Sequence, residues 1–388
     1  MTRYNIISAD VHITEPPDIW KNHLPKKYQE HAPKLVKDHE GGDAWLYAGS
    51  ANPDPIGLTT TPGKRFEDFR WHGVSYDDPD VRPGCFNGKA RLEDMDIDGI
   101  DAEIIFPPQR TIGHWLGNAD DELVHAGVDA YNEFAFDEFA VDPKRQIPMF
   151  QLPSTGVDNA IRYLEKAKEK GAKGVVIGCW PSGKENLSDE DDKFWAALVE
   201  SGLPLTIHIN VIGRESRMKA QKAGSTATQG VKKGAPNANQ RAIGGMAGVF
   251  AMVPPTLGNM IFQGIFDRFP DLKVILIETG VGWIPHFMEQ LDDRYWRNRG
   301  WGEINIKEAP SYYWHQNFAA TFIMDVIGLQ IRHAVGVENM MWSTDYPHHG
   351  CDWPYSRKVI DETFVGIDPT EREKILAGNA VRLWKLDQ

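Results

Sequence analysis

PLTIHIN, at residues 204–210, shows the pattern that decides the fold: a short apolar run that ends on a polar side chain, His208. Seven more stretches share this form, each apolar and bounded by turn signals: NIISADVH (5–12), AEIIFP (102–107), QIPMFQLP (146–153), KGVVIGC (173–179), KVILIET (273–279), FAATFI (318–323) and MMWSTDYP (340–347). Short apolar runs are typical of parallel strands that are buried on both faces. We therefore expect eight buried parallel strands.

Helical patterns separate most of these strands. VDNAIRYLEKAKEKG (157–171) places its apolar residues on one face and stops at a glycine, and DEDDKFWAALVESG (189–202) opens with acidic residues that favour a helix N-terminus. Strands that alternate with helices favour an α/β fold with a parallel sheet. We expect a distorted (β/α)8 TIM barrel that forms one domain over residues 1–388.

Two stretches are too long for the minimal repeat of such a barrel. They are the inserts 13–90, after the first strand, and 211–252, after the fifth strand. Between residues 211 and 250 there are seven basic residues and one acidic residue. Loops after barrel strands lie at the face where active sites form, so the inserts are predicted to form a mouth or lid. Arg214 and Arg217 are predicted to bind an anionic substrate; the alternative is a solvated surface loop.

The composition excludes several classes of protein. Lys and Arg number 42 against 55 Asp and Glu, which gives a net charge of −13 and argues against a nucleic-acid or anionic-membrane partner. Three cysteines are too few for a disulfide framework, and neither a secretory signal nor an unbroken membrane-spanning stretch is evident. We expect a cytoplasmic protein that acts on a small molecule.

The chemistry lies in polar residues at the carboxyl ends of the apolar strands: Asp10, His12, His208, Glu278 and Asp345. Asp10 and His12 alternate along one strand and so share a face, and strand ends in a barrel converge on its axis. Any one of them alone could be a turn residue or a core histidine. A divalent cation is the simplest compensation for buried carboxylates, so the five are predicted to bind one or two ions, with Zn²⁺ favoured and Mn²⁺ or Fe²⁺ possible.

Such a metal centre would lower the pKa of a bound water towards ~7 and produce hydroxide at neutral pH. Asp345 is the predicted base beside that water. His348, three residues on, is predicted to protonate a leaving group, although a hydrogen-bonded loop histidine is an equal alternative. Glu278 is either a further metal ligand or an acid/base with a raised pKa.

Five motifs carry a resemblance to a known family: ADVHITEPPDIW (9–20), LTIHIN (205–210), LIETGVGWIPHFMEQLDDR (276–294), MWSTDYPHHG (341–350) and GNAVRLW (378–384). Together they resemble the amidohydrolase-2 (amidohydrolase-related) family, which includes the aminocarboxymuconate-semialdehyde and resorcylate decarboxylases. The resemblance implies a metal-binding TIM barrel, commonly dimeric, with Asp10, His12, His208 and Asp345 as ligands. It also implies that Arg294 helps to bind a substrate carboxylate.

One position departs from that resemblance. The decarboxylases carry a catalytic histidine where this chain has Glu278. We therefore expect, first, a metal-dependent hydrolase that cleaves an amide, ester or thioester of a carbon-rich acid, coenzyme A thioesters included. The alternative is a metal-dependent non-oxidative decarboxylase of an aromatic or unsaturated carboxylic acid, and a third hypothesis is a metal-bound scaffold without activity. A homodimer is predicted in each case.

Overall fold

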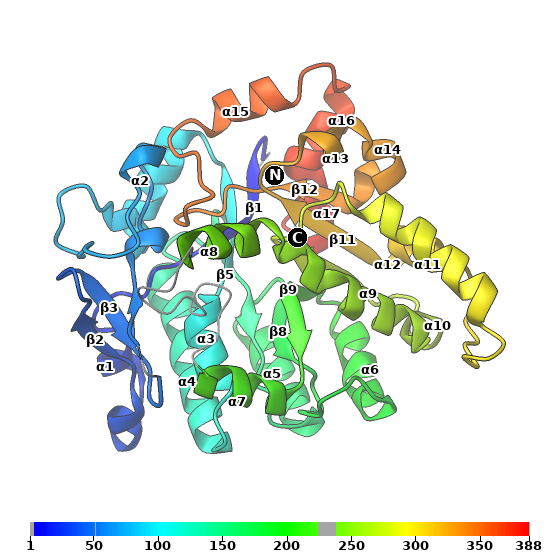
Figure 1. Cartoon of the computed structure of the whole chain (residues 1–388), viewed down its shortest axis with the longest axis horizontal. Coiled ribbons are helices and arrows are strands. Elements are labelled where there is room, and N and C mark those ends of the chain that lie inside the picture. Colours follow the sequence, from blue (N-terminus) through cyan, green and yellow to red (C-terminus); the bar gives the residue numbers. More distant parts are fainter. Residues whose placement is uncertain (1–3, 51, 224–237, 388) are drawn as a thin grey trace.

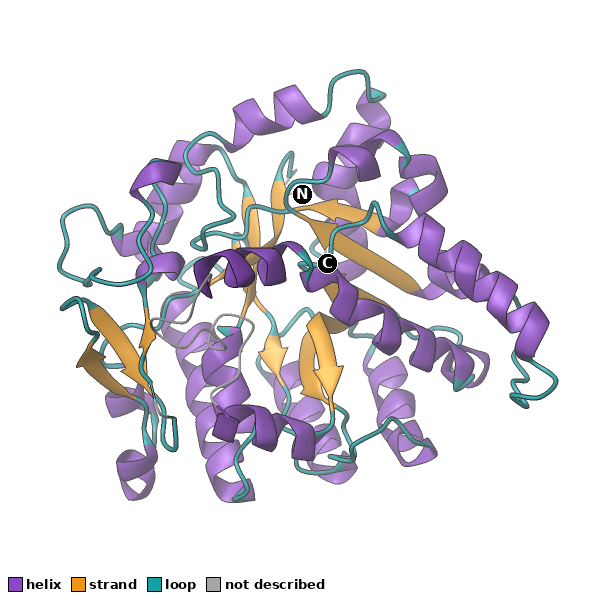
Figure 2. Cartoon of the chain, viewed as in Figure 1, coloured by secondary structure: helices purple, strands orange, loops and turns teal. Residues whose placement is uncertain are grey.

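The computed structural model describes residues 4–50, 52–223 and 238–387, and it confirms an α/β fold (Figures 1 and 2). The eight apolar stretches form nine strands, because the stretch 146–153 holds both β6 and β7. Every pairing between these strands is parallel. In chain order these strands are β1 (Ile7–His12), β5 (Ala102–Phe106), β6 (Gln146–Pro148), β7 (Phe150–Gln151), β8 (Val175–Cys179), β9 (Leu205–Ile212), β10 (Val274–Ile277), β11 (Phe318–Phe322) and β12 (Met340–Trp342).

The hydrogen-bonded ladders do not run continuously around the predicted distorted barrel. They form two parallel sheets, with the orders β1-β5-β6 and β12-β11-β10-β9-β8-β7. The stretch 146–153 changes partner within one residue: the Met149 N–H donates to the Ile105 carbonyl, and the Phe150 N–H donates to the Gly174 carbonyl. Pro148, which has no N–H to donate, stands directly before this change.

At the other junction, irregular backbone connects the two sheets. The Asp345 N–H donates to the Asp10 carbonyl at 3.0 Å, and the His12 N–H donates to the Tyr346 carbonyl at 2.7 Å. Side chains from both sheets, including Ile104, Val176 and Ile275, pack in one buried cluster with Trp384. The two sheets therefore enclose a common interior.

Helices cover the outside of the sheets, and the larger apolar core lies between the two layers. In α5 (Val157–Glu169), for example, Ala160, Leu164 and Ala167 are buried at helical spacing. The covering helices are α2 (Gly88–Asp98), α3 (Gln109–Leu116), α4 (Asp121–Glu133), α5 (Val157–Glu169), α6 (Asp192–Ser201), α9 (Val253–Phe262), α10 (Ile265–Arg268), α11 (Ile284–Asn298), α12 (Pro310–Asn317), α13 (Val326–Gln330), α14 (Arg332–Val335), α15 (Ser356–Thr363), α16 (Pro369–Glu373) and α17 (Asn379–Trp384).

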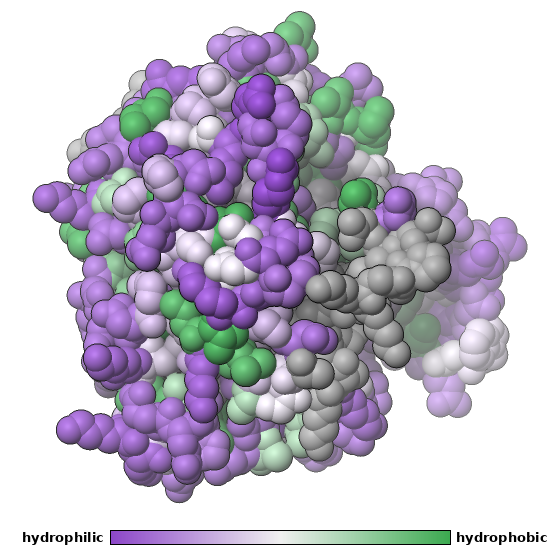
Figure 3. Space-filling view, turned by 60° about the vertical axis from the view of Figure 1, so that its left-hand side comes forward, coloured by the Kyte–Doolittle hydropathy of each residue, from purple (hydrophilic) through white to green (hydrophobic). Residues whose placement is uncertain are grey.

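The first insert forms a small unit of its own. After α1 (Ile19–His23), a three-stranded antiparallel sheet, which the sequence analysis did not predict, is made of β2 (Lys34–Lys37), β3 (Asp43–Leu46) and β4 (Asp54–Pro55). It lies at the left edge of Figure 1. Figure 3 brings this side forward and shows mainly hydrophilic residues, with hydrophobic ones in small separate groups.

The second insert follows β9 with α7 (Arg214–Ala223) and α8 (Ala238–Ala247). Its Phe250 ring lies 6.4 Å from the Trp283 ring, so the insert packs against the segment that leads into α11. Two of the seven basic residues of this insert, Lys232 and Lys233, lie outside the described residues. Its role as a mouth or lid stays a prediction.

Among the described residues, no single helix is long and apolar enough to cross a membrane. Two neighbouring helical segments, 240–247 and 249–262, meet that test only together and are bent by 60°. The three cysteines are buried and free.

Candidate metal centre

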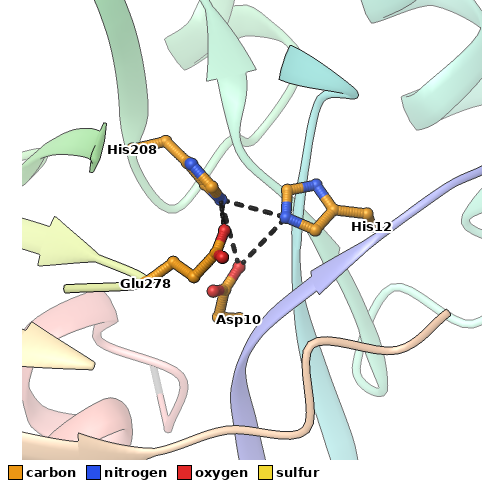
Figure 4. A group of neighbouring side chains, drawn as sticks. All are labelled: Asp10, His12, His208 and Glu278. Carbon is orange, nitrogen blue, oxygen red and sulfur yellow. Dashed lines mark hydrogen bonds and ion pairs between the residues drawn. The ribbon is translucent and has the colours of Figure 1, made fainter. Parts of the chain in front are cut away.

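Four of the predicted residues meet at one point: Asp10, His12, His208 and Glu278 (Figure 4). The Nε2 atoms of the two histidines are 2.9 Å apart. Asp10 Oδ1 lies 3.5 Å from His12 Nε2 and 3.6 Å from His208 Nε2, and Glu278 Oε2 lies 3.5 Å from His208 Nε2. The end of β1, the middle of β9 and the residue directly after β10 therefore bring two imidazoles and two carboxylates together.

This arrangement fits a bound divalent cation. Ligand atoms about 2.1 Å from a common ion lie roughly 3.0–3.5 Å from each other, which matches the observed spacing. Both carboxylate oxygens of Asp10 are buried and have no hydrogen-bond partner among the described residues. Buried polar atoms without partners are costly, and a cation would satisfy them. The four residues thus have the donor set and spacing of a divalent-metal site.

Asp345 and His348 extend this site. Asp345 Oδ1 lies 3.6 Å from His12 Nε2, and His348 Nδ1 lies 3.0 Å from the same oxygen. The His348 ring stacks on the His12 ring with centroids 4.3 Å apart. His12, Asp345 and His348 form a second group with metal-ligand spacing, and His12 belongs to both groups. Because one imidazole nitrogen binds one ion, the shared His12 favours a single ion.

Two of the acidic residues have an unusual backbone. Glu278 has a φ of 58° and Asp345 a φ of 55°, in the left-handed region that non-glycine residues rarely adopt. Each is held there by neighbours: the Glu278 N–H donates to Thr321 Oγ1 at 2.8 Å, and the Asp345 N–H donates to the Asp10 carbonyl. Backbone strain of this kind concentrates at functional sites, where surrounding structure maintains it.

The close packing of buried acidic side chains shifts their pKa values. Burial, with the nearby charge of Asp345 and Asp10, raises the pKa of Glu278 well above its ordinary value. Burial and Asp10 do the same to the pKa of Asp345. Burial lowers the pKa of His12, whereas at His208 burial is outweighed by the nearby carboxylates of Asp10 and Glu278 together, so the pKa is raised. A cation would therefore compete with a proton for the Glu278 carboxylate.

The predicted substrate-binding arginines lie elsewhere in the structure. Arg214 pairs with Asp121 at 2.6 Å, and Arg217 donates to the Gly178 carbonyl at 2.7 Å, so both tie α7 to the framework. Arg294 is exposed on α11. Their substrate-binding roles stay predictions.

The sequence analysis did not predict a second buried polar cluster. Glu15, directly before Pro16, accepts a hydrogen bond from the Thr111 hydroxyl at the start of α3. Thr111 also bonds with the Tyr47 hydroxyl at 2.8 Å, and the adjacent Arg110 pairs with Asp54 of β4. Burial raises the pKa of Glu15 to about 7. No short motif announces this cluster, because the insert brings its parts together.

The raised pKa of Glu15 predicts that the free energy of unfolding depends on pH. A carboxyl group whose pKa is raised on folding makes its full contribution to stability below its unfolded pKa, and this contribution is lost as the pH rises from about 4.5 to about 7. Glu15→Gln should remove the loss, so that the variant exceeds the wild type by roughly 2 kcal/mol at pH 8. Urea unfolding between pH 5 and pH 8 measures this, with exposed Glu67→Gln as control. Parallel pH profiles for Glu15→Gln and wild type would contradict it.

Glu278→Ala tests metal ligation directly. We expect about one ion per chain in the wild type and an affinity about 10- to 100-fold weaker in the variant, because a carboxylate ligand is lost. Elemental analysis and metal titration give both numbers. Glu289→Ala, on the exposed face of α11, is the matched control. Unchanged affinity in Glu278→Ala would remove Glu278 from the ligand set.

Comparisons with known proteins show the family of this chain. A sequence model of the family described as "Amidohydrolase" matches residues 9–386. The chain is 26% identical to the decarboxylase orsB of Emericella nidulans over 69% of this chain and 77% of the relative. It is 23% identical to 2-amino-3-carboxymuconate-6-semialdehyde decarboxylase of Dictyostelium discoideum over 79% of each chain. It is 25% identical to gamma-resorcylate decarboxylase of a Polaromonas species over 77% of this chain and 87% of the relative.

Solved structures share the fold. An amidohydrolase from Mycobacterium avium subsp. paratuberculosis has a TM-score of 0.71 at 20% identity, covering 99% of this chain and 100% of that one. A dihydroxybenzoic acid decarboxylase from a Polaromonas species was solved with manganese and the inhibitor 2-nitroresorcinol. It has a TM-score of 0.62 at 17% identity, and the match covers 100% of this chain and 98% of that one.

These findings correct the functional prediction. A hydrolase of an amide, ester or thioester was expected first, but the three curated relatives and several of the similar structures are decarboxylases. The replacement of the family's catalytic histidine by Glu278 was weighed against a decarboxylase, but Glu278 was also predicted as a metal ligand, and the structure places it in the metal-ligand cluster. The preference for zinc, the homodimer and the cytoplasmic location stay predictions.

Proposed function

Since the chain belongs to the amidohydrolase family, we propose that it is a metal-dependent, non-oxidative decarboxylase of an aromatic or unsaturated carboxylic acid. The observation that carries the proposal is the contact of the buried Asp345 carboxyl group with both His12 of the metal-ligand cluster, at 3.6 Å, and His348, at 3.0 Å. The decarboxylases among the relatives support the reaction type.

Asp10, His12, His208 and Glu278 are the residues that would hold the cation, and Asp345 lies beside them. The bound ion would supply a positive charge that binds the acidic substrate and offsets the negative charge that develops on it. Of the ions predicted, we now favour manganese over zinc, because manganese accepts carboxylate and imidazole ligands alike and is present in similar solved structures.

The protein's own task is to provide a proton. In decarboxylation the bond between the substrate carbon and its carboxylate breaks, the electron pair stays on carbon, CO₂ leaves, and a proton forms the new C–H bond. Asp345, with its raised pKa, holds that proton in the site. His348 is 3.0 Å away and neutral, because burial lowers its pKa to about 3, so it can relay a replacement proton from the partly exposed side.

The test is direct measurement of CO₂. Protein loaded with Mn²⁺, Zn²⁺ or Fe²⁺ is incubated with 2,6-dihydroxybenzoate, 5-carboxyvanillate and 2-amino-3-carboxymuconate-6-semialdehyde, and CO₂ and the decarboxylated product are measured together. We expect release in equal amounts from at least one acid, and loss of release on chelation. Failure of every acid with every metal would overturn the proposal.

A further inference from the structure

The turn that carries Glu278 leaves β10 sharply and leads into α11 through residues 278–283, ETGVGW. Glu278 has a φ of 58° and Gly280 a φ of 64°, so two of its first three residues adopt the left-handed backbone. A glutamate keeps such a backbone only where neighbouring groups hold it. The place of the Glu278 carboxylate therefore depends on the contacts that hold this turn.

Thr321 holds the first half of the turn. The Glu278 N–H donates to Thr321 Oγ1 at 2.8 Å, and the Gly280 N–H donates to the Thr321 carbonyl at 3.2 Å. Thr321 is fully buried and belongs to β11, the strand that pairs with β10. One buried threonine thus fixes the backbone on both sides of Thr279.

Asp325 holds the second half of the turn. Its Oδ2 atom accepts from the Val281 N–H and from the Gly282 N–H, each at 2.7 Å. Its Oδ1 atom accepts from the Gly328 N–H at 2.7 Å and so caps the N-terminus of α13. A Cβ atom at Gly282 would lie 2.8 Å from Asp325 Oδ1, so the glycine permits this close approach. The carboxylate therefore joins the turn to α13.

We propose that Thr321 and Asp325 are positioning residues of the metal centre, which hold the Glu278 carboxylate at its place beside His208 (Figure 4). The inference rests on the metal centre of the proposed function and adds the contacts behind one of its ligands. Loss of a hydrogen bond that supports a ligand typically weakens metal binding by about 10- to 100-fold. Here the support reaches the backbone of the ligand, so it acts by fixing the φ of Glu278.

Titration of the metal-free protein with Mn²⁺ tests the role of Thr321 through a matched pair of variants. Thr321→Val keeps the shape of the side chain but removes the oxygen that accepts from the Glu278 N–H, so metal affinity should fall about 10-fold. Thr321→Ser keeps that oxygen and should bind Mn²⁺ within about threefold of the wild type. The visible absorption of bound Co²⁺, which depends on the arrangement of its ligands, should change in Thr321→Val alone.

The double variant Glu278→Ala/Thr321→Val separates positioning from general damage to the site. If Thr321 acts through Glu278, its replacement should change metal affinity by less than about twofold once the Glu278 carboxylate is absent. A further fall of about 10-fold in the double variant would overturn the role of Thr321, because the damage would then take another route. Equal affinities in Thr321→Val and the wild type would overturn it as well, and so would an unchanged affinity in Glu278→Ala.

Asp325→Ala removes both the contacts to the turn and the cap of α13, and its metal affinity should fall about 10-fold. Asp368→Ala is the matched control, because Asp368 caps α16 by accepting from the Thr370 N–H at 2.8 Å. It should lose a helix cap and keep its metal affinity within about twofold. Asp325→Asn, which keeps one acceptor oxygen, guards against misfolding and should lie between Asp325→Ala and the wild type. Equal metal affinities in Asp325→Ala and Asp368→Ala would overturn the role of Asp325.

These titrations need no turnover, so their outcome is separable from that of the proposed function. A protein whose metal affinity depends on Thr321 and Asp325 but which releases no CO₂ from any acid would refute the decarboxylase and keep this inference. A protein that releases CO₂ but binds Mn²⁺ equally well in every variant would do the reverse.

Discussion

Asp345→Asn should abolish CO₂ release, with kcat falling by about 10³- to 10⁴-fold. The amide keeps the size of the carboxyl group but cannot hold and deliver the proton that the substrate carbon needs. KM should change far less than kcat, because the carbon must still be protonated after the substrate has bound. Steady-state rates at saturating Mn²⁺ measure this, since Asp345 also lies 3.6 Å from His12 and its replacement should weaken metal binding.

The control is His349→Asn, in the exposed residue next to His348, which should retain activity within about threefold. Metal content must be measured on the same samples. If Asp345→Asn retains a full ion and more than a tenth of the wild-type rate, the proton comes from another group. If it retains the ion and the fold but loses turnover, the hypothesis of a metal-bound scaffold without activity is refuted.

Arg91→Met should destabilise the fold by about 3–5 kcal/mol, a large fraction of the stability of an ordinary domain. Arg91 is fully buried and pairs with Glu103 of β5 at 2.9 Å. It also donates to the His12 carbonyl at 2.7 Å and to the Gly84 carbonyl at 2.7 Å, and its guanidinium lies 4.0 Å from the centre of the Tyr346 ring. Its removal leaves the Glu103 carboxylate buried without this partner.

Urea unfolding of the metal-free proteins separates this effect from metal loss. The double variant Arg91→Met/Glu103→Met removes both charges and should recover at least half of the lost stability, because no unpaired carboxylate remains. Arg162→Met, on the exposed side of α5, is a control that should change stability by less than about 0.5 kcal/mol. A loss below about 1 kcal/mol in Arg91→Met would show that water reaches Glu103.

The strands and most of the metal centre were predictable from the sequence for one physical reason. A buried parallel strand is a short apolar run, and a charged residue at its carboxyl end is conspicuous and costly unless it is compensated. Asp10, His208 and Glu278 each stand in that position, so their convergence followed from the alternation of strands and helices. The structure brings them within reach of one ion.

The small sheet of the first insert could not be read in the same way. Its strands KLVK (34–37), DAWL (43–46) and DP (54–55) are short and do not alternate regularly between polar and apolar residues, so they lack both the length and the pattern that mark a strand. The Arg110–Asp54 pair joins residues 56 positions apart across this sheet. Its partners can be recognised only after the insert has folded.

The reaction type was mispredicted because one cluster of ligands suits two chemistries. A carboxylate and imidazole centre serves hydrolysis and decarboxylation equally, and the difference lies in which group supplies a proton. The 3.0 Å contact between Asp345 and His348 depends on the turn that joins them, with Asp345 at a φ of 55°. Residue spacing alone does not show that contact.

The junction between the first and last strands sets the time at which the site can form during synthesis. The Ser8 hydroxyl lies 2.9 Å from the Thr344 hydroxyl across 336 residues of chain, and the Asp345 N–H closes on Asp10 beside it. Chains emerge from the ribosome N-terminus first, so Asp10 and His12 wait for nearly the whole chain before Asp345 arrives. A nascent chain that stops before residue 345 has only part of the ligand set, and we expect metal loading to follow release from the ribosome.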